Sequence, residues 1–144
     1  MTASANRERM AQFYEKISNR KEFGVIDDLV AEDVIDHMPL PGMPPGRAGL
    51  RVAMEMILGA FPDARFTIHN LTADEDRVVG VWSMDATHTG AIFGIPPTGR
   101  PVHMSGIDAI RWRDGQAAEI WHVEEVASML MQIGAVPPPG GPPA

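Results

Sequence analysis

The sequence contains no cysteine among its 144 residues. Disulfide bonds, thiolate zinc sites and a cysteine nucleophile are therefore excluded. No apolar run reaches the roughly 18 residues that span a bilayer, and the opening "MTASANRERM" is followed by no apolar segment typical of a secretory signal. We therefore expect a cytoplasmic protein with no membrane partner.

Positive charge is also scarce. Twelve Lys and Arg stand against 19 Asp and Glu, which gives a formal net charge of −7. Nucleic acids and anionic membrane surfaces would repel such a chain, so neither is expected as a partner. The sequence has no G-x-G-x-x-G, no phosphate loop and no pair of His residues at a ligand spacing with a nearby acid. We therefore expect no cofactor and no metal.

The length suits one domain with one core, and an apolar fraction of 44% is normal for a globular protein. Residues 1–136 are expected to form this domain. The last residues, 137–144, read "PPPGGPPA". Because Pro and Gly cannot build a core, the sequence predicts a mobile tail over this segment.

Two kinds of periodicity divide the domain. Apolar residues recur every three or four positions in 4–21, 22–34 and 50–61, which predicts three helices. Between them, 36–49 holds four prolines and three glycines and is expected to be a loop. From residue 64 the period becomes two, and strands are predicted over 64–73, 77–90, 102–113 and 116–126, followed by a short helix over 126–134. This order predicts an α+β fold: a curved antiparallel or mixed sheet wrapped by three N-terminal helices, with a short C-terminal helix.

An Asp and a His interrupt the apolar pattern of the last two strands, in "GIDAIRWRDGQAAEIWHVEE". Asp114-Gly115 predicts a hairpin turn between them. A two-residue loop would place Asp108 and His122 on opposite faces of the sheet. A three-residue loop pairing Trp112 with Gln116 would place them on one face as diagonal neighbours, and this geometry is favoured because it gives the more plausible partition of polar residues.

A carboxylate beside an imidazole is the minimum equipment for proton transfer. We therefore predict Asp108 and His122 as a catalytic pair; the alternative is a structural polar pair that satisfies itself in the interior. His122 could be the base with Asp108 orienting it, or Asp108 the base with His122 protonated as the acid. His88 is interpreted as a structural residue that holds the loop "GIPPTGR".

The remaining candidates are apolar or amphipathic residues expected to line a pocket around this pair. Trp112 shares strand parity with Asp108 and is the first choice, and His37 lies in the Pro-rich loop. The predicted substrate-binding residues are His37, Trp82, Met104, Ile110, Trp112 and Ile120.

Several segments together resemble a known family. They are "DHMPLPGMPPGRAGLR", "FPDARFTIHNLTADEDRVVGVWSMDATHTGAIFGIPPTGRPV", "GIDAIRWRDG" and "EIWHVEEVASMLMQIG". The chain resembles, over roughly residues 7–137, the SnoaL-like polyketide cyclases, also called ester cyclases, of the nuclear transport factor 2-like superfamily. The resemblance implies a cone-shaped α+β barrel with the Pro-rich loop near its mouth.

The resemblance also implies a function. In these cyclases a His before the turn and an Asp on the last strand act on the inner face; here the two residue types are exchanged, as Asp108 and His122. It implies a cofactor-independent acid–base enzyme acting on a small hydrophobic carbonyl compound, most simply an intramolecular aldol-type cyclase. The alternatives are hydration, isomerisation, hydroxylation or epoxide opening in the same pocket, or a binder without catalysis. Epoxide-hydrolase relatives carry an Arg where this chain has Gly106. Relatives associate through the outer sheet face, so we expect a homodimer or a higher homo-oligomer.

Overall fold

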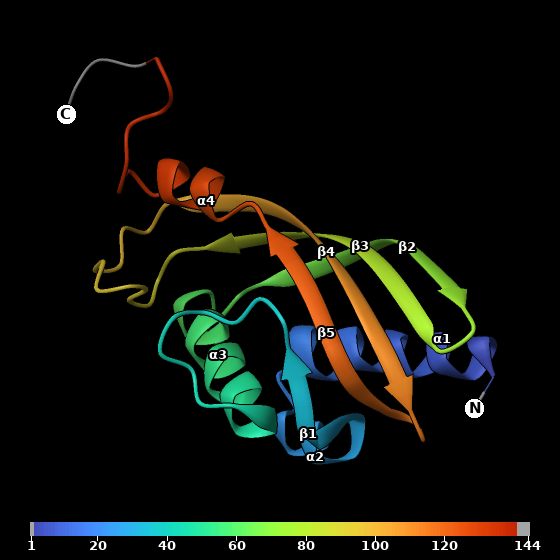
Figure 1. Ribbon diagram of the computed structural model, residues 1–144. Helices are drawn as coiled ribbons and strands as arrows, with labels where there is room; N and C mark the ends of the chain where they lie inside the picture. The colour runs from blue at the N-terminus through green and yellow to red at the C-terminus, as the bar shows by residue number, and fades with distance from the viewer. Residues whose placement is uncertain (1, 141–144) are drawn as a thin grey trace.

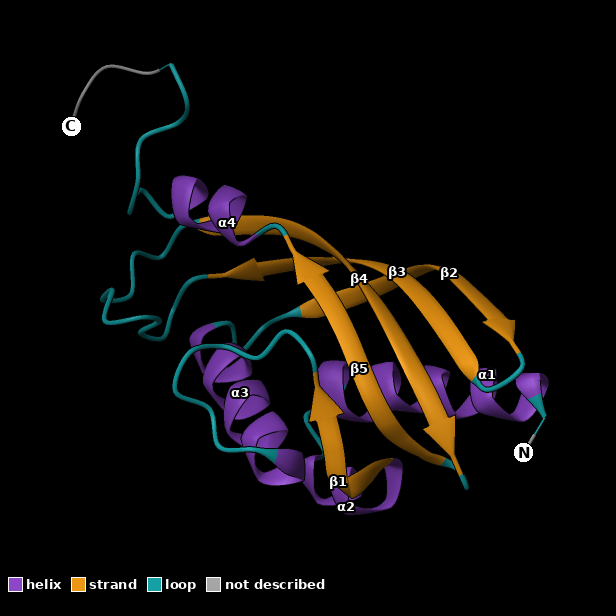
Figure 2. Cartoon of the chain, viewed as in Figure 1, coloured by secondary structure: helices purple, strands orange, loops and turns teal. Residues whose placement is uncertain are grey.

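The computed structural model describes residues 2–140, and Figure 1 follows them from the N-terminal helix to the C-terminal segment. It confirms the α+β class (Figure 2). The helical segments are α1 (Ala3–Gln12), a π-helix η1 (Phe13–Asn19), a 3-10 turn η2 (Phe23–Val25), α2 (Ile26–Leu29), α3 (Gly46–Ala60) and α4 (Val126–Gln132). The strands are β1 (Val30–Asp36), β2 (Arg65–Asp74), β3 (Arg77–Thr87), β4 (Pro101–Arg113) and β5 (Gln116–Glu124).

The five strands form one sheet in the order β1-β5-β4-β3-β2. Strands β2 to β5 pair antiparallel with their sequence neighbours, while β1 joins the edge beside β5 in parallel. The sheet curves, and α1 and α3 lie on the same side of it (Figure 2). α1 contacts β2 and β3, and α3 contacts β1, so the apolar face of the sheet is covered where these helices meet it.

Strand β1 is the main difference from the sequence-based assignment, which placed 22–34 in a single helix. Only Phe23–Leu29 is helical; the chain turns extended at Val30. A short apolar run fits the periodicity of a helix and that of a strand equally well. The strand with which this segment pairs, β5, is far away in sequence. Val30 pairs with Ala117, and Asp36 pairs with Ile120. Tertiary pairing with β5 therefore decides the structure of this segment.

The β4–β5 hairpin also differs from the favoured prediction. Asp114 and Gly115 have φ of 51° and 78°, the left-handed values of a two-residue hairpin turn, and Arg113 pairs with Gln116. The three-residue loop was therefore wrong. The extra residue lies one step further along β5, between the pairs Trp112–Ala117 and Arg111–Glu119. This bulge shifts the register by one residue.

The consequence of the bulge is a direct pairing of the two candidate residues. Asp108 lies opposite His122, with Gly106 opposite Glu124 and Ile110 opposite Ile120. Paired residues on neighbouring strands present their side chains to the same face. The shared face was expected, but it results from a bulge in the strand rather than from the turn.

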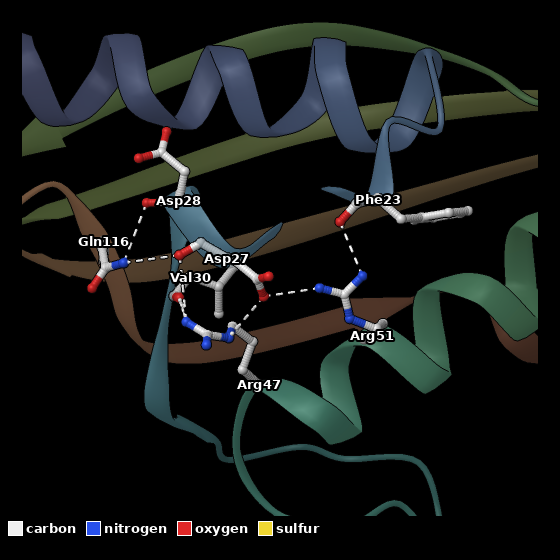
Figure 3. A network of polar contacts seen from close by, with 7 residues as sticks. All are labelled: Phe23, Asp27, Asp28, Val30, Arg47, Arg51 and Gln116. Atoms are coloured by element: carbon white, nitrogen blue, oxygen red, sulfur yellow. Dashed lines mark hydrogen bonds and ion pairs between the residues drawn. The ribbon is translucent and has the colours of Figure 1, made fainter. Parts of the chain in front are cut away.

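A polar network fixes the helices against the end of the sheet (Figure 3). The carboxylate of Asp27 in α2 pairs with Arg47 at 3.2 Å and with Arg51 at 2.9 Å, both from α3. The side chain of Gln116 in β5 donates to the carbonyl oxygens of Asp27 and Asp28. The short helix α2 is thus bonded both to α3 and to β5, which anchors α3 beside the sheet.

The C-terminal segment was predicted to be a mobile tail over 137–144. Residues 137–140 are exposed and lie outside any helix or strand, and 141–144 fall outside the described residues. Mobility, and the boundary of the domain, therefore stay predictions. Within residues 2–140, none of the helices has the length and apolar character needed to cross a membrane.

Candidate active site

A large apolar cavity lies between the sheet and the helices. Its volume is about 720 Å³. The Pro-rich loop, α3, η1 and the inner faces of β3, β4 and β5 all contribute to its wall. Six of the residues proposed from the sequence line it: Trp82, Met104, Asp108, Ile110, Ile120 and His122.

Asp108 projects from the middle of β4 into this cavity. One carboxylate oxygen, Oδ2, accepts two hydrogen bonds: from the Tyr14 hydroxyl at 2.7 Å and from the Trp82 indole N–H at 3.0 Å. Both donors are neutral groups from other elements, η1 and β3. They hold the carboxylate in one orientation and leave Oδ1 with no side-chain partner within residues 2–140.

Burial controls the protonation of Asp108. Removal from water disfavours the carboxylate and raises the pKa of Asp108 to about 6, with the Tyr14 hydrogen bond acting in the opposite direction. The nearby negative charge of Glu124 raises the pKa further. The carboxyl therefore titrates close to neutral pH, which is where a general base is most effective.

His122 lies opposite Asp108 and is held by two other carboxylates. Its Nε2–H donates to both oxygens of Asp36 at 3.1 Å, and its Nδ1–H donates to Glu124. These hydrogen bonds, that to Asp36 foremost, raise the pKa of His122 to about 10. His122 is therefore an imidazolium at neutral pH, with both ring nitrogens engaged.

The interaction with His122 also changes the pKa of Asp36. Although partial burial works to raise it, the pKa of Asp36 lies below its usual value because His122 and the Met38 backbone N–H donate to it. Asp36 is the last residue of β1, which lies beside β5. The strand that the sequence did not predict therefore carries the main hydrogen-bond partner of His122. In one of the two arrangements left open by the sequence, Asp108 orients the imidazole; in the structure Asp36 and Glu124 do so instead.

Tyr14 is the functional candidate that sequence reasoning missed. It shares the apolar stripe of the first helix with Met10 and Ile17, so its spacing gives no signal beyond that of a buried helix residue. It is indeed buried, but it lies in the π-helix η1, and its hydroxyl reaches Asp108. Burial beside that carboxylate raises the pKa of Tyr14, so its hydroxyl stays protonated and donates.

His37 does not line the cavity, contrary to the prediction. Alternation along β1 and its continuation points Asp36 inward and His37 outward. On the outer side the His37 ring stacks on Trp121, with centroids 4.5 Å apart, and Nε2 contacts Glu119 at 3.1 Å. The Pro-rich loop does reach the cavity, through Pro39, Leu40 and Met43.

Trp112 also lies outside the cavity, although it faces inward with the expected parity. It is 2% exposed and belongs to the core with Met10. Arg9, in the last turn of α1, reaches this end of the hairpin and donates to the Gly115 carbonyl at 2.8 Å. Core packing fills the inner face here, and the cavity extends only as far as Ile110.

The structural interpretation of His88 is confirmed. Its ring is fully buried, and Nδ1 lies 2.9 Å from the Thr98 hydroxyl. Its backbone N–H donates to the carbonyl of Arg100, and its carbonyl accepts from Gly99. These bonds close the loop between β3 and β4.

The part of the chain that the structure describes contains no group of three His, Cys, Asp or Glu side chains arranged to bind a metal ion. The side chains of the cavity offer groups suited to proton transfer: a carboxyl of raised pKa with one free oxygen, a neutral phenol and indole, and an imidazolium held by two carboxylates.

Comparison with known proteins identifies the family. The family model of the SnoaL-like polyketide cyclases matches residues 8–133. The chain belongs to this family, and the expectation from the sequence segments is confirmed. A search of curated proteins found no match.

Solved structures agree. IdmH from Streptomyces antibioticus, described as a proposed polyketide cyclase, is 29% identical, with a TM-score of 0.77 over 90% of this chain and 98% of that one. A proposed polyketide cyclase from Acidithiobacillus ferrooxidans is 27% identical, with a TM-score of 0.78 over 92% and 97%. AclR from Streptomyces galilaeus, described as a proposed hydroxylase, is 26% identical, with a TM-score of 0.83 over 94% and 85%. Proteins of similar fold are thus described as catalysing different reactions.

Proposed function

We propose that this protein is a cofactor-independent acid–base enzyme that removes a proton from carbon next to a carbonyl group, and that the reaction is an intramolecular aldol closure of a small hydrophobic polyketide-type ester. The observation that carries the proposal is the state of Asp108. A carboxyl with a pKa of about 6, anchored by two neutral donors in an apolar cavity, is equipped as a general base.

In the proposed reaction the free oxygen of Asp108 takes the proton from the α-carbon. The electron pair of the broken C–H bond passes to the carbonyl oxygen and forms an enolate. The enolate carbon then attacks a second carbonyl of the same molecule, forming a C–C bond and an alkoxide. Asp108, now protonated, returns its proton to this alkoxide, so the step needs no oxidant, reductant or external acid.

His122 acts in this proposal as a fixed positive charge. Because both ring N–H groups donate to Asp36 and Glu124, the imidazole has no free nitrogen with which to remove a proton. Its charge stabilises the carboxylate of Asp108 and the negative charge that develops on substrate oxygen. Of the two arrangements that the sequence left open, this geometry supports Asp108 as the base.

The cavity wall supports a ligand without a negative charge. Asp36, Asp108 and Glu124 line it together with His122, and no Lys or Arg of residues 2–140 does so. Among the residues that the structure describes, His122 is the one cation in this wall and is already bonded to two of these carboxylates, so a free carboxylate on the ligand would meet an excess of negative charge. Apolar side chains make up most of the remaining wall, which fits a hydrophobic carbonyl compound.

Deuterium exchange tests this proposal without the natural substrate. 2-Acetylnaphthalene is incubated with the protein in D2O, and loss of the methyl proton signal is followed by NMR. We expect the wild type to accelerate exchange over buffer and Asp108→Asn to lose about 10²-fold or more of that acceleration. Asp85→Asn, an exposed carboxylate of β3, is the matched control and should behave as the wild type.

Equal rates in the wild type and in Asp108→Asn would contradict the proposal. Binding of the ketone without exchange would favour a non-catalytic binder. The other reactions that a cavity of this family can perform, such as hydration or isomerisation, would be distinguished by product analysis once Asp108-dependent exchange is established.

A further inference from the structure

Two glycines in the middle of the sheet flank Asp108. Gly80 is paired directly opposite Asp108 on β3, and Gly106 precedes Asp108 by two residues on β4. Because alternate residues share a face, both glycines lie on the inner face beside the carboxylate. Glycine in a strand interior weakens the strand and often marks a close approach of another group.

Each glycine is in contact with one of the two donors to Asp108. A Cβ built on Gly80 would lie 2.3 Å from the Tyr14 hydroxyl oxygen, and one built on Gly106 would lie 2.2 Å from the Trp82 ring. Both distances are far shorter than any non-bonded carbon contact permits. The space that the donors occupy is therefore the space that a side chain at these positions would fill.

The two donors converge from different directions. Tyr14 comes from η1, which lies over the sheet, and Trp82 comes from the neighbouring strand β3. Both donate to the same oxygen, Oδ2 of Asp108. The π-helix adds to this arrangement, since such segments change the direction of the side chains within a helix and occur often at functional sites.

We infer that Gly80 and Gly106 are positioning residues: each leaves the inner face open beside Asp108, so that the Tyr14 hydroxyl and the Trp82 indole N–H reach one carboxylate oxygen and turn the other toward the cavity. The inference refines the proposed function and rests on it for its catalytic meaning. The geometry itself can be tested without turnover. Any side chain at position 106 would require Trp82 to move.

Titration of the Asp108 carboxyl by 13C NMR, on protein labelled at aspartate, measures this arrangement directly. Both hydrogen bonds favour the carboxylate, so losing either should move the titration midpoint above about 6. We expect Gly106→Ala to raise the midpoint because the new methyl group displaces the indole. Gly59→Ala is the matched control: a Cβ there meets no atom within 4 Å, and the midpoint should not change.

A double-mutant comparison shows whether the glycine acts through its donor. Trp82→Phe should raise the midpoint by itself, and Gly106→Ala added to it should raise the midpoint no further. The pair Tyr14→Phe and Gly80→Ala should behave in the same way. A midpoint unchanged in Gly106→Ala, or one that moves equally with and without the indole, would overturn the inference.

The single donor variants keep the inference testable if alanine prevents folding. Trp82→Phe and Tyr14→Phe remove atoms rather than add them, and an unchanged midpoint in both would also overturn it. The outcome is separable from that of the proposed function. A midpoint that responds as expected, in a protein that exchanges no ketone protons, would leave the positioning role intact and remove the enzymatic one.

Discussion

Asp108 and His122 are directly paired across β4 and β5, yet each side chain is hydrogen-bonded to other residues. Tyr14 and Trp82 hold Asp108, while Asp36 and Glu124 hold His122. The two groups therefore interact through their charges across the cavity wall. Asp108 is thus a base of raised pKa and His122 a permanent cation, and the role of each residue can be tested by its own variants.

Asp36→Asn should lower the pKa of His122 from about 10, because the largest contribution to the raised value is the hydrogen bond from Nε2 to Asp36. The variant keeps the size of the side chain and removes its charge. Titration of the His122 ring protons by NMR measures the effect.

The stability of the fold should depend on pH through Asp108. Its pKa is raised from 3.8 in the unfolded chain to about 6 in the folded one, so the folded state binds this proton more tightly. The stabilisation is complete below pH 3.8 and is lost as the pH rises through 6. Between pH 4 and pH 7 the wild type should lose about 1–3 kcal/mol of unfolding free energy relative to Asp108→Asn. Urea unfolding at both pH values measures the difference, and parallel changes in the two proteins would contradict it.

At high pH the corresponding effect comes from His122. Its pKa is raised from 6.5 to about 10, so its stabilising contribution is present below pH 6.5 and declines as the pH approaches 10. Unfolding measured at pH 7 and pH 10 should show a larger loss of stability in the wild type than in His122→Gln. An equal loss in both would show that the ion pairs with Asp36 and Glu124 contribute nothing to the fold.

We expect a homodimer that forms through the outer face of the sheet. Val79, Ile107 and Val123 are exposed there, at 38%, 45% and 52%, on three adjacent strands. Exposed apolar surface of this kind often marks an interface. Light scattering should give twice the chain mass for the wild type and a monomer for Val123→Asp. A wild-type monomer at micromolar concentration would contradict the expectation.

Local signals in the sequence were sufficient for most of the fold. Period-two patterning located β2 to β5, and period-three-and-four spacing located α1 and α3. Segment 30–36 could not be assigned from such signals because its strand conformation depends on pairing with β5, more than 80 residues later. The bulge beside Ala117 gave no signal of its own, since two alanines can face either way.

The site was predictable where it depends on strand parity and unpredictable where it depends on packing between elements. Parity along β4 grouped Asp108 with Ile110, and parity along β5 grouped Ile120 with His122. That both groups share the cavity wall results from the bulge in β5, which the sequence did not predict. Parity also placed Trp112 on the inner face, but only the position of α1 decides that this end is filled. Tyr14 could not be separated from its apolar neighbours, because its role depends on where a helix 94 residues away in sequence crosses the sheet.

The pH dependence of ketone exchange tests most directly the claim that Asp108 is the base of this cavity. The rate for 2-acetylnaphthalene should rise with pH around a midpoint of about 6, as the carboxylate forms, and should fall again toward pH 10, as His122 loses its charge. Asp108→Asn should show no rise near pH 6. Protein-dependent exchange with no midpoint near 6, or the same midpoint in Asp108→Asn, would contradict the claim.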